Sequence, residues 1–390
     1  MVHISSFLRE IRPYAFAEID RVREELRKSG VDVIDFGVGD PTSPTPEVVR
    51  EACKRAVDLR ARSGYPSYEG SPEFREAVAR WFERRFGVTL NPEEEVTATI
   101  GSKQAIFLFP LAYVDPGDVV LIPDPGYPPY TSGAKARMAK CFYLPLEEVN
   151  SFFPDLSEIP PDVAKRAKIL WINYPNNPTT KIATKNFLKE AVDFCIDNDV
   201  ILASDEAYSE LYYDSKPPSV LNVDGSWEVS FVFNSLSKRS SMTGYRVGFA
   251  AASRELLEPF KRVQTQTHSG VANFIQDASV AALSDESHVD RLRDEYRVKR
   301  DKLVSTLKEI GMASVYSEGT FYVWAKAPKG HDSLSLSSLL LREAYINTVP
   351  GKALSQESSA GDLFVRFALV PSLEQTEEAC ERLREVQLHS

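Results

Sequence analysis

The chain has 390 residues, of which 43% are hydrophobic and 11% aromatic, and its formal net charge at pH 7 is −10. A chain of this length exceeds what one hydrophobic core usually holds, so a globular protein with at least two lobes is expected. The acidic balance argues against sequence-independent binding to nucleic acid, which requires clustered lysine and arginine side chains.

The cysteines and the chain start narrow the class of protein further. Cys53, Cys141, Cys195 and Cys380 lack the close spacing of a zinc site or a disulfide framework, so no metal site is predicted. The first residues carry charges without the apolar core of a signal peptide, and no run approaches about 18 apolar residues. We therefore expect a soluble cytoplasmic protein with reduced thiols.

The first hundred residues are predicted to hold helices joined by glycine- and proline-rich connections. In one connection Gly39 has no side chain, so a substrate carboxylate could approach the backbone there; a plain turn is the alternative. Tyr65 and Tyr68 are loop aromatics, a common feature with no necessary function. The pattern predicts helices over 14–29 and 46–59, and another that begins after Ser71 with proline in its first turn.

Residues 97–109 have the pattern of a strand, a glycine turn and the start of a helix. A helix N-terminus presents free amide donors and a partial positive charge, so Ser102 and Lys103 are candidate phosphate contacts. A routine turn between strand and helix is the alternative. A second buried strand runs into prolines beside Tyr127, whose ring could stack on a flat cofactor or simply form a corner. Residues 142–165 are interpreted as a proline-broken connector without chemistry.

Polar residues also follow two later apolar runs. Asn177 comes after the run 169–172, and Asp205 and Tyr208 come after the run 200–203. An aspartate at a strand end could keep a pyridine nitrogen protonated, which lets the ring accept electrons. Asn177 and Tyr208 could donate to the phenolic oxygen of such a ring. Taken singly, the two segments would be a turn and a helix cap.

The segment 231–249 is the strongest candidate for chemistry. Its apolar start ends in Ser235, Ser237 and Lys238, and Arg246 follows eight residues later. A lysine just past a strand can form a Schiff base with an aldehyde, while hydroxyls and a guanidinium hold a phosphate dianion. An ordinary basic loop is the alternative for this segment alone, and it becomes improbable beside Asn177 and Asp205.

Strands that alternate with helices indicate a mostly parallel sheet covered on both faces, with function at the carboxyl ends of its strands. After residue 311, strands and helices are grouped separately, which predicts a smaller α+β lobe. There Arg366 lies in an apolar run and requires a partner, either a substrate carboxylate or an internal salt bridge. The pattern predicts helices at 185–197, 255–266, 270–310 and 334–343, and strands at 200–204, 227–234 and 249–252.

Together these motifs resemble the fold-type I pyridoxal 5'-phosphate (PLP) aminotransferases of class I and II, from Gly39 to Arg366. The resemblance implies PLP as cofactor and ping-pong transfer of an amino group between an amino acid and a 2-oxo acid. It implies an α/β fold with a mostly parallel seven-stranded sheet between helices, plus a smaller α+β domain. We predict an N-terminal arm and part of the small domain at 1–45, the large PLP-binding domain at 46–290 and the small domain at 291–390.

The resemblance also implies a role for each candidate residue. Tyr65, five residues before Gly70, would reach the cofactor phosphate of a partner subunit, so a homodimer is expected. The catalytic residues would be Lys238, Asp205 and Tyr208. Cofactor binding would use these three with Ser102, Lys103, Tyr127, Asn177, Ser235, Ser237, Arg246 and Tyr65, and substrate binding would use Gly39, Asn177 and Arg366; no metal is implied.

Several phrases, among them IGSKQAIFLFPLA and NSLSKRSSMTGYRVGFA, resemble the LL-diaminopimelate aminotransferase group, which makes a lysine and cell-wall precursor with glutamate as donor. Aspartate, alanine and aromatic aminotransferases share the cofactor motifs and stay open as alternatives. A fold-type I lyase or decarboxylase and a non-catalytic PLP-binding regulator are further rivals. Departures from the family pattern at Thr180, Arg239 and 268–270 bear on the substrate and leave the cofactor motifs intact.

Overall fold

The larger part of the molecule is built on a seven-stranded sheet. The structure is a computed structural model that describes residues 3–11, 17–312 and 314–388. The strand order is β2-β8-β7-β6-β5-β3-β4, and β8 alone runs against its neighbours, which confirms the predicted mostly parallel sheet. The strands are β2 (Val96–Thr99), β3 (Val119–Asp124), β4 (Lys140–Pro145), β5 (Ala167–Asn173), β6 (Ile201–Asp205), β7 (Ser230–Ser235) and β8 (Gly248–Ala252).

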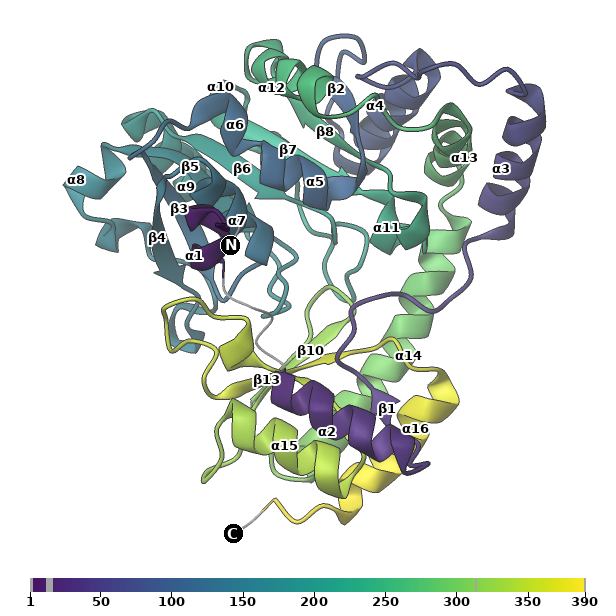
Figure 1. The fold of residues 1–390 in the computed structure, drawn as a ribbon, viewed down its shortest axis with the longest axis vertical. Coiled ribbons are helices and arrows are strands. Elements are labelled where there is room, and N and C mark those ends of the chain that lie inside the picture. The colour runs from purple at the N-terminus through teal and green to yellow at the C-terminus, as the bar shows by residue number, and fades with distance from the viewer. Residues whose placement is uncertain (1–2, 12–16, 313, 389–390) are drawn as a thin grey trace.

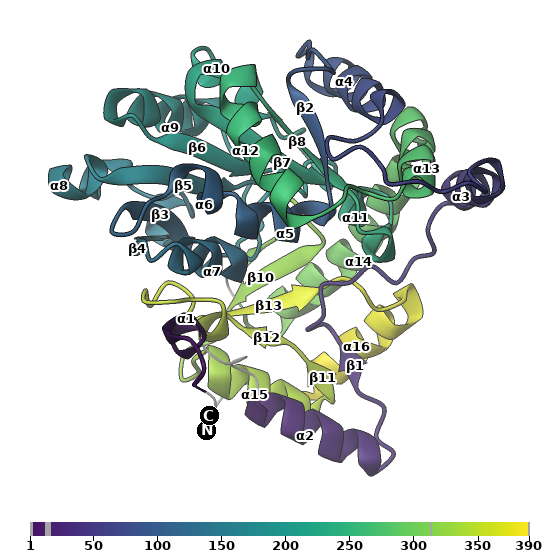
Figure 2. The ribbon, with the colours of Figure 1, turned by 45° about the horizontal axis from the view of Figure 1, so that its top comes forward.

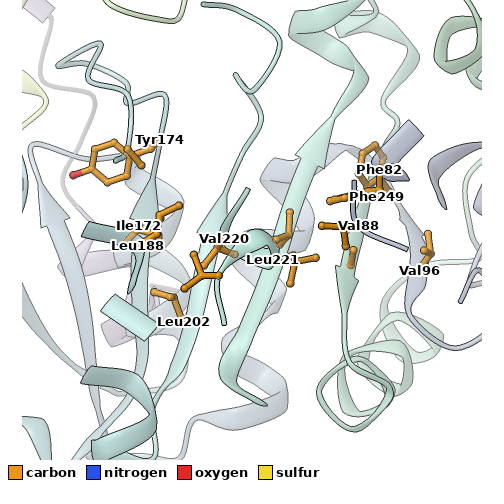
Figure 3. Close-up of a cluster of buried hydrophobic side chains, with 14 of the residues drawn as sticks. Phe82, Val88, Val96, Ile172, Tyr174, Leu188, Leu202, Val220, Leu221 and Phe249 are labelled. Carbon is orange, nitrogen blue, oxygen red and sulfur yellow. The ribbon is translucent and has the colours of Figure 1, made fainter. Parts of the chain in front are cut away.

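Both faces of this sheet are buried, so its strands are almost continuously apolar. Successive side chains point to opposite faces: Phe231 and Phe233 pack in one apolar cluster, and Val232 packs in the other. Figure 3 shows part of the second cluster, including Ile172, Leu202 and Phe249. An unpaired polar group inside the sheet is therefore costly, which favours polar side chains at the ends of the strands.

Helices form the layer on each face (Figure 1). On one face lie α5 (Gly101–Leu108), α6 (Pro110–Tyr113), α7 (Pro128–Ala136) and α12 (Arg254–Thr267). The other face is covered by α4 (Pro72–Phe86), α9 (Lys185–Asn198) and α13 (Asn273–Ser284), the last of which packs on α3 (Glu47–Leu59). The remaining helices of this part are the short α1 (Ser6–Glu10), α8 (Pro161–Ala164), α10 (Ser226–Val229) and α11 (Leu236–Arg239).

The smaller part joins the C-terminal quarter of the chain to an N-terminal segment (Figure 2). Its antiparallel sheet has the order β12-β13-β10-β9, and β1 pairs with β11 in a separate parallel ribbon. The long helix α14 (Ser287–Glu309) runs from the larger part into the smaller one (Figure 1). The other elements are α2 (Ala17–Lys28), β1 (Ile34–Asp35), β9 (Val315–Tyr316), β10 (Tyr322–Lys326), α15 (Ser333–Glu343), β11 (Ile346–Asn347), β12 (Val349–Pro350), β13 (Phe364–Ala368) and α16 (Leu373–Glu385).

Three expected elements differ from the structure. The predicted strand 227–234 begins only at Ser230, because the residues before it form α10. The predicted long helix 270–310 is interrupted where Asp285 accepts a hydrogen bond from the Ser287 amide, which starts a new helix. The predicted connector 142–165 begins within β4, an edge strand with partly exposed side chains.

The predicted domain limits at 45 and 290 stay a prediction, and residues 14–16 of the first predicted helix lie outside the described residues. In the part of the chain that the structure describes, no helix is long and apolar enough to cross a membrane. The same residues contain no cluster of three or more histidine, cysteine, aspartate or glutamate side chains that could hold a metal ion.

Candidate active site

A cavity of about 840 Å³ lies at the carboxyl ends of the parallel strands and is also lined by residues of the smaller part. All but one of the predicted site residues line it. These are Gly39, Ser102, Lys103, Tyr127, Asn177, Asp205, Tyr208, Ser235, Ser237, Lys238, Arg246 and Arg366. The exception is Tyr65, whose side chain is 91% exposed outside the cavity.

Asp205 ends β6 and is the buried acid of the cavity. Its carboxylate accepts a hydrogen bond of 2.7 Å from the Tyr130 hydroxyl and one of 3.1 Å from the Ala207 amide. Burial raises the pKa of Asp205 to about 6, although both hydrogen bonds act in the opposite direction. A cationic partner in the cavity would therefore stabilise the ionised carboxylate.

Lys238 lies in α11, the short turn that follows β7. Its Nζ donates a hydrogen bond of 2.6 Å to the Gly39 carbonyl. Burial lowers the pKa of Lys238 to about 8; the Asp40 carboxylate opposes this shift, and the Arg366 guanidinium adds to it. The amine can thus lose its proton near neutral pH, as a nucleophile or a general base requires.

Hydroxyl groups and cationic side chains contribute to the lining of the cavity. Ser102 lies in the first turn of α5, and the Ser235 hydroxyl accepts a hydrogen bond of 3.1 Å from the Ser237 amide. Lys103 and Arg246 bring two positive charges to the same lining. Such a set of hydroxyls, a helix N-terminus and cations suits a phosphate dianion.

Backbone geometry places Arg246 against α5. Arg246 has a φ of 55°, and its Nη1 donates to the Thr243 carbonyl at 2.6 Å. Gly101 has a φ of 66°, and a Cβ added there would lie 2.6 Å from Nη2 of Arg246. Glycine is therefore required for both its conformation and the space it leaves.

Arg366 on β13 offers a carboxylate site on the smaller part. Its side chain donates to Oδ1 of Asn177 at 2.8 Å and to the Gly37 carbonyl at 3.0 Å, and its buried Nε has no partner. Among the described residues no carboxylate pairs with it, so the predicted alternative of an internal salt bridge is wrong. A guanidinium with a free donor is suited to a substrate carboxylate.

Three contacts of the site were not predicted from the sequence. The Tyr322 hydroxyl oxygen lies 3.1 Å from the Tyr208 hydroxyl oxygen. A Cβ atom added to Gly39 would lie 2.3 Å from the same Tyr322 oxygen. Tyr130 contacts Asp205, and Asn173 donates to the Asp205 carbonyl at 2.9 Å. Tyr322 and Tyr130 belong to apolar or proline-rich runs that look like packing, whereas Asn173 ends a strand and carried the same signal as Asp205.

The departures from the family pattern lie outside the cavity lining. Thr180 is buried with a φ of 66°, a conformation that glycine adopts more easily. Arg239 follows Lys238, but its guanidinium pairs with Glu286 at 2.8 Å and lies 5.2 Å from the Trp81 ring. The half-buried ring of His268 accepts a hydrogen bond from the Gly270 amide. In this chain the three departures do not touch the site directly.

The cavity fits PLP on its own geometry. A buried carboxylate, an amine, a tyrosine ring, several hydroxyls and cationic side chains all line the same space. A family model described as aminotransferase class I and II matches residues 31–383, which is nearly the whole chain. The chain belongs to this family.

Relatives of this aminotransferase match it along their full length. It is 45% identical over 390 residues to the LL-diaminopimelate aminotransferase of Aquifex aeolicus strain VF5, with both chains covered completely. The solved apo structure of BacF from Bacillus subtilis is 32% identical, with a TM-score of 0.93 and complete coverage of both chains. An aspartate aminotransferase variant from Thermus thermophilus is 30% identical, with a TM-score of 0.90 and coverage of 98% and 99%.

The enzyme is thus a PLP-dependent transaminase with the fold-type I architecture, as the sequence motifs predicted. The cofactor, the enzyme class and the fold are all confirmed by these comparisons. The roles of the individual residues, by contrast, remain predictions from the sequence and from the geometry of the cavity.

The raised pKa of Asp205 predicts how the cofactor-free protein responds to pH. A carboxyl with a folded-state pKa of about 6, above its ordinary value of 3.8, contributes stability at low pH that is lost as pH rises through 6. In Asp205→Asn, urea unfolding should therefore depend less on pH between 4.5 and 7.5. At pH 7.5 the variant should exceed wild type by up to about 3 kcal/mol.

The exposed residue Asp224 supplies the matched control, because Asp224→Asn makes the same chemical change outside the cavity. Its stability should follow wild type at every pH. Identical pH profiles for Asp205→Asn and wild type would show that burial does not disfavour the charge of Asp205.

Proposed function

We propose that this aminotransferase exchanges an amino group between LL-diaminopimelate and 2-oxoglutarate, and so serves lysine biosynthesis. The observation that carries the proposal is the 45% identity, over both complete chains, with the LL-diaminopimelate aminotransferase of Aquifex aeolicus. The cavity agrees with substrates that carry two carboxylates, because Lys135 and Lys352 line it in addition to Arg366. Aspartate, alanine and aromatic donors are the alternatives.

We assign one task to each group around the cofactor. Bound PLP supplies an electron sink and an aldehyde that carries the amino group between the two half-reactions. The Asp205 carboxylate holds the proton on the pyridine nitrogen, and the ring of Tyr127 stacks on the pyridine face. Ser102, Lys103, Ser235, Ser237 and Arg246 bind the phosphate.

The substrate side uses groups from both parts of the molecule. Arg366 binds the α-carboxylate, beside the backbone of Gly39. Because Oδ1 of Asn177 accepts from Arg366, its Nδ2 is free to donate to the phenolic oxygen together with the Tyr208 hydroxyl. Lys238 Nζ, with a pKa lowered to about 8, would take the α-proton of the bound amino acid and hold it for return.

A fold-type I lyase or decarboxylase would use the same lysine and aspartate, and differs in which bond of the amino acid is broken. Membership of the aminotransferase family favours transamination over lyase and decarboxylase activity, and it also argues against a non-catalytic regulator. Dependence of turnover on a 2-oxo acid separates the classes. The expected cytoplasmic location stays a prediction.

We also propose a homodimer in which Tyr65 reaches the phosphate of the partner's cofactor. The Tyr65 side chain is almost fully exposed, and several apolar side chains close to it in the sequence are exposed as well: Val57, Leu59 and Tyr68. A group of exposed apolar residues is typical of an interaction surface. The proposal gives both features one explanation.

Replacing the lysine tests the catalytic assignment. Lys238→Ala should lower turnover by about a thousandfold or more, because both the covalent link and the proton transfer are lost. Circular dichroism and stoichiometric PLP binding should remain. Lys189→Ala, on the exposed side of α9, is the control and should keep full activity. Unchanged activity in Lys238→Ala would overturn the assignment.

Titration of the PLP-loaded enzyme with single amino acids tests the substrate. LL-diaminopimelate and glutamate should remove the visible absorption band of the cofactor, whereas aspartate, alanine and phenylalanine should leave it intact. The physical reason is that only donors with suitably placed distal charges can use the extra cations of the cavity. Loss of the band with aspartate, alanine or phenylalanine instead would keep the transaminase and exclude this pathway.

Mixed dimers test the role of Tyr65. If Tyr65 serves the partner's site, unfolding and refolding an equal mixture of Lys238→Ala and Tyr65→Ala should restore activity, because one site of each heterodimer then contains neither change. Each variant refolded alone is the control and should stay impaired. A monomer in sedimentation velocity, or a mixture no more active than the mean of its components, would contradict the proposal.

A further inference from the structure

One wall of the cavity is a loop of the smaller part, residues 351–363, between β12 and β13. Apart from a single 3₁₀ turn at Gly351–Ala353 it has no regular structure. Leu354, Ser355 and Gln356 nevertheless line the cavity. A loop of this length needs contacts outside itself to keep one conformation.

Those contacts converge on Asp124, the last residue of β3 in the larger part. Its Oδ1 accepts a hydrogen bond from the Gln356 amide at 2.7 Å. Its Oδ2 accepts from the Glu357 and Ser358 amides at 2.9 and 2.7 Å. Three consecutive amides thus surround one carboxylate, an arrangement that favours a negative charge.

Asp124 is completely buried, with 0% of its surface exposed. Among the described residues no lysine, arginine or histidine forms an ion pair with it. A buried charge requires compensation, and the loop amides provide it here. The Asp124 carboxylate and the observed loop conformation therefore stabilise each other.

Two further hydrogen bonds join the loop to the turn after β3. The Ser358 hydroxyl donates to the Asp124 carbonyl at 3.2 Å, and the Gly126 amide donates to the Leu354 carbonyl at 3.3 Å. The next residue is Tyr127, which lines the cavity from the larger part. The same contacts therefore hold the loop beside the tyrosine wall.

The position of the loop relates it to the substrate side chain. Val349, just before the loop, is paired with Arg366 in the sheet, so the loop leaves the sheet beside the proposed α-carboxylate site. From there it crosses to the turn before Tyr127. An amino acid held by Arg366, with its α-carbon at the cofactor, would extend its side chain along this wall.

We propose that Asp124 is a positioning residue, which holds the loop 351–358 against the substrate side chain and thereby favours long donors over short ones. This inference rests on the proposed function, because it requires that the cavity bind an amino acid through Arg366. Asp124 itself touches the loop rather than the substrate, so its effect is on specificity.

Hydrogen exchange of the PLP-loaded enzyme tests the anchoring. In Asp124→Asn the side chain has a single acceptor oxygen, and its NH₂ group must face at least one of the three loop amides. The amides of 356–358 should then exchange at least about tenfold faster. Asp332→Asn, which replaces a carboxylate that caps α15, is the control and should leave these amides unchanged. Unchanged exchange in Asp124→Asn would overturn the proposal.

Single-turnover reactions with LL-diaminopimelate and with the shorter donor glutamate test specificity. In Asp124→Asn the rate constant divided by the dissociation constant should fall about tenfold or more for LL-diaminopimelate and less than about threefold for glutamate. PLP affinity should stay at the wild-type value. Equal losses for both donors, or no loss despite faster exchange, would contradict a role in specificity.

Ser358→Ala is a milder second variant should Asp124→Asn fail to fold. It removes the hydroxyl bond to the Asp124 carbonyl and the bond that the hydroxyl accepts from the Ala360 amide, but it keeps all three amide bonds to the Asp124 carboxylate. It should therefore shift exchange and the donor ratio in the same direction by a smaller factor; no shift in either would overturn the proposal. If the wild-type enzyme reacts with neither donor, the proposed function fails. The exchange rates at 356–358 then still decide whether Asp124 anchors the loop.

Discussion

The central sheet is buried on both faces, and this constraint determines where polar chemistry can lie. Strand interiors such as Phe231–Phe233 admit only apolar side chains, because an unpaired polar group there would lose its hydration without compensation. Asp205 and Lys238 follow the buried stretches of parallel neighbours, so they meet at one edge of the sheet. The active-site cavity is the space that this edge leaves open toward the smaller part.

Charge balance inside the cavity depends on groups from several elements. Burial moves Asp205 and Lys238 toward their neutral forms, with pKa values of about 6 and 8. A cofactor with a protonated ring nitrogen, a phosphate and an aldehyde supplies the partners that these groups lack. The cavity is therefore suited to a ligand that carries charges of both signs. Among the residues that the structure describes, neither Asp205 nor Lys238 forms an ion pair within the protein.

The segment that contains Gly37 and Gly39 contacts functional groups of both parts of the molecule. The Gly37 carbonyl accepts from Arg366 of the smaller part, and the Gly39 carbonyl accepts from Lys238 of the larger part. On the other side of the cavity Asp124 binds the loop 351–358. The geometry of the site thus depends on how the two parts are held together, and contacts beyond the reacting groups contribute to it.

The sequence by itself determined the elements and the groups that end them. Apolar runs followed by Asn177, Asp205 or Lys238 are local patterns, and twelve candidate residues from these and similar patterns line one cavity. It was less informative for boundary segments: the connector predicted at 142–165 begins within β4, and Asp285 and Glu286 separate α13 from α14 within the helix predicted at 270–310.

Only the tertiary structure decided the contacts between distant segments. Tyr130 reaches Asp205 across 75 positions, and Asp124 holds amides more than 230 positions away. In the sequence these residues look like an aromatic in a proline-rich corner and a turn aspartate. Their roles depend on which strand ends and loops become neighbours. Long-range packing decides those neighbours, and local composition does not.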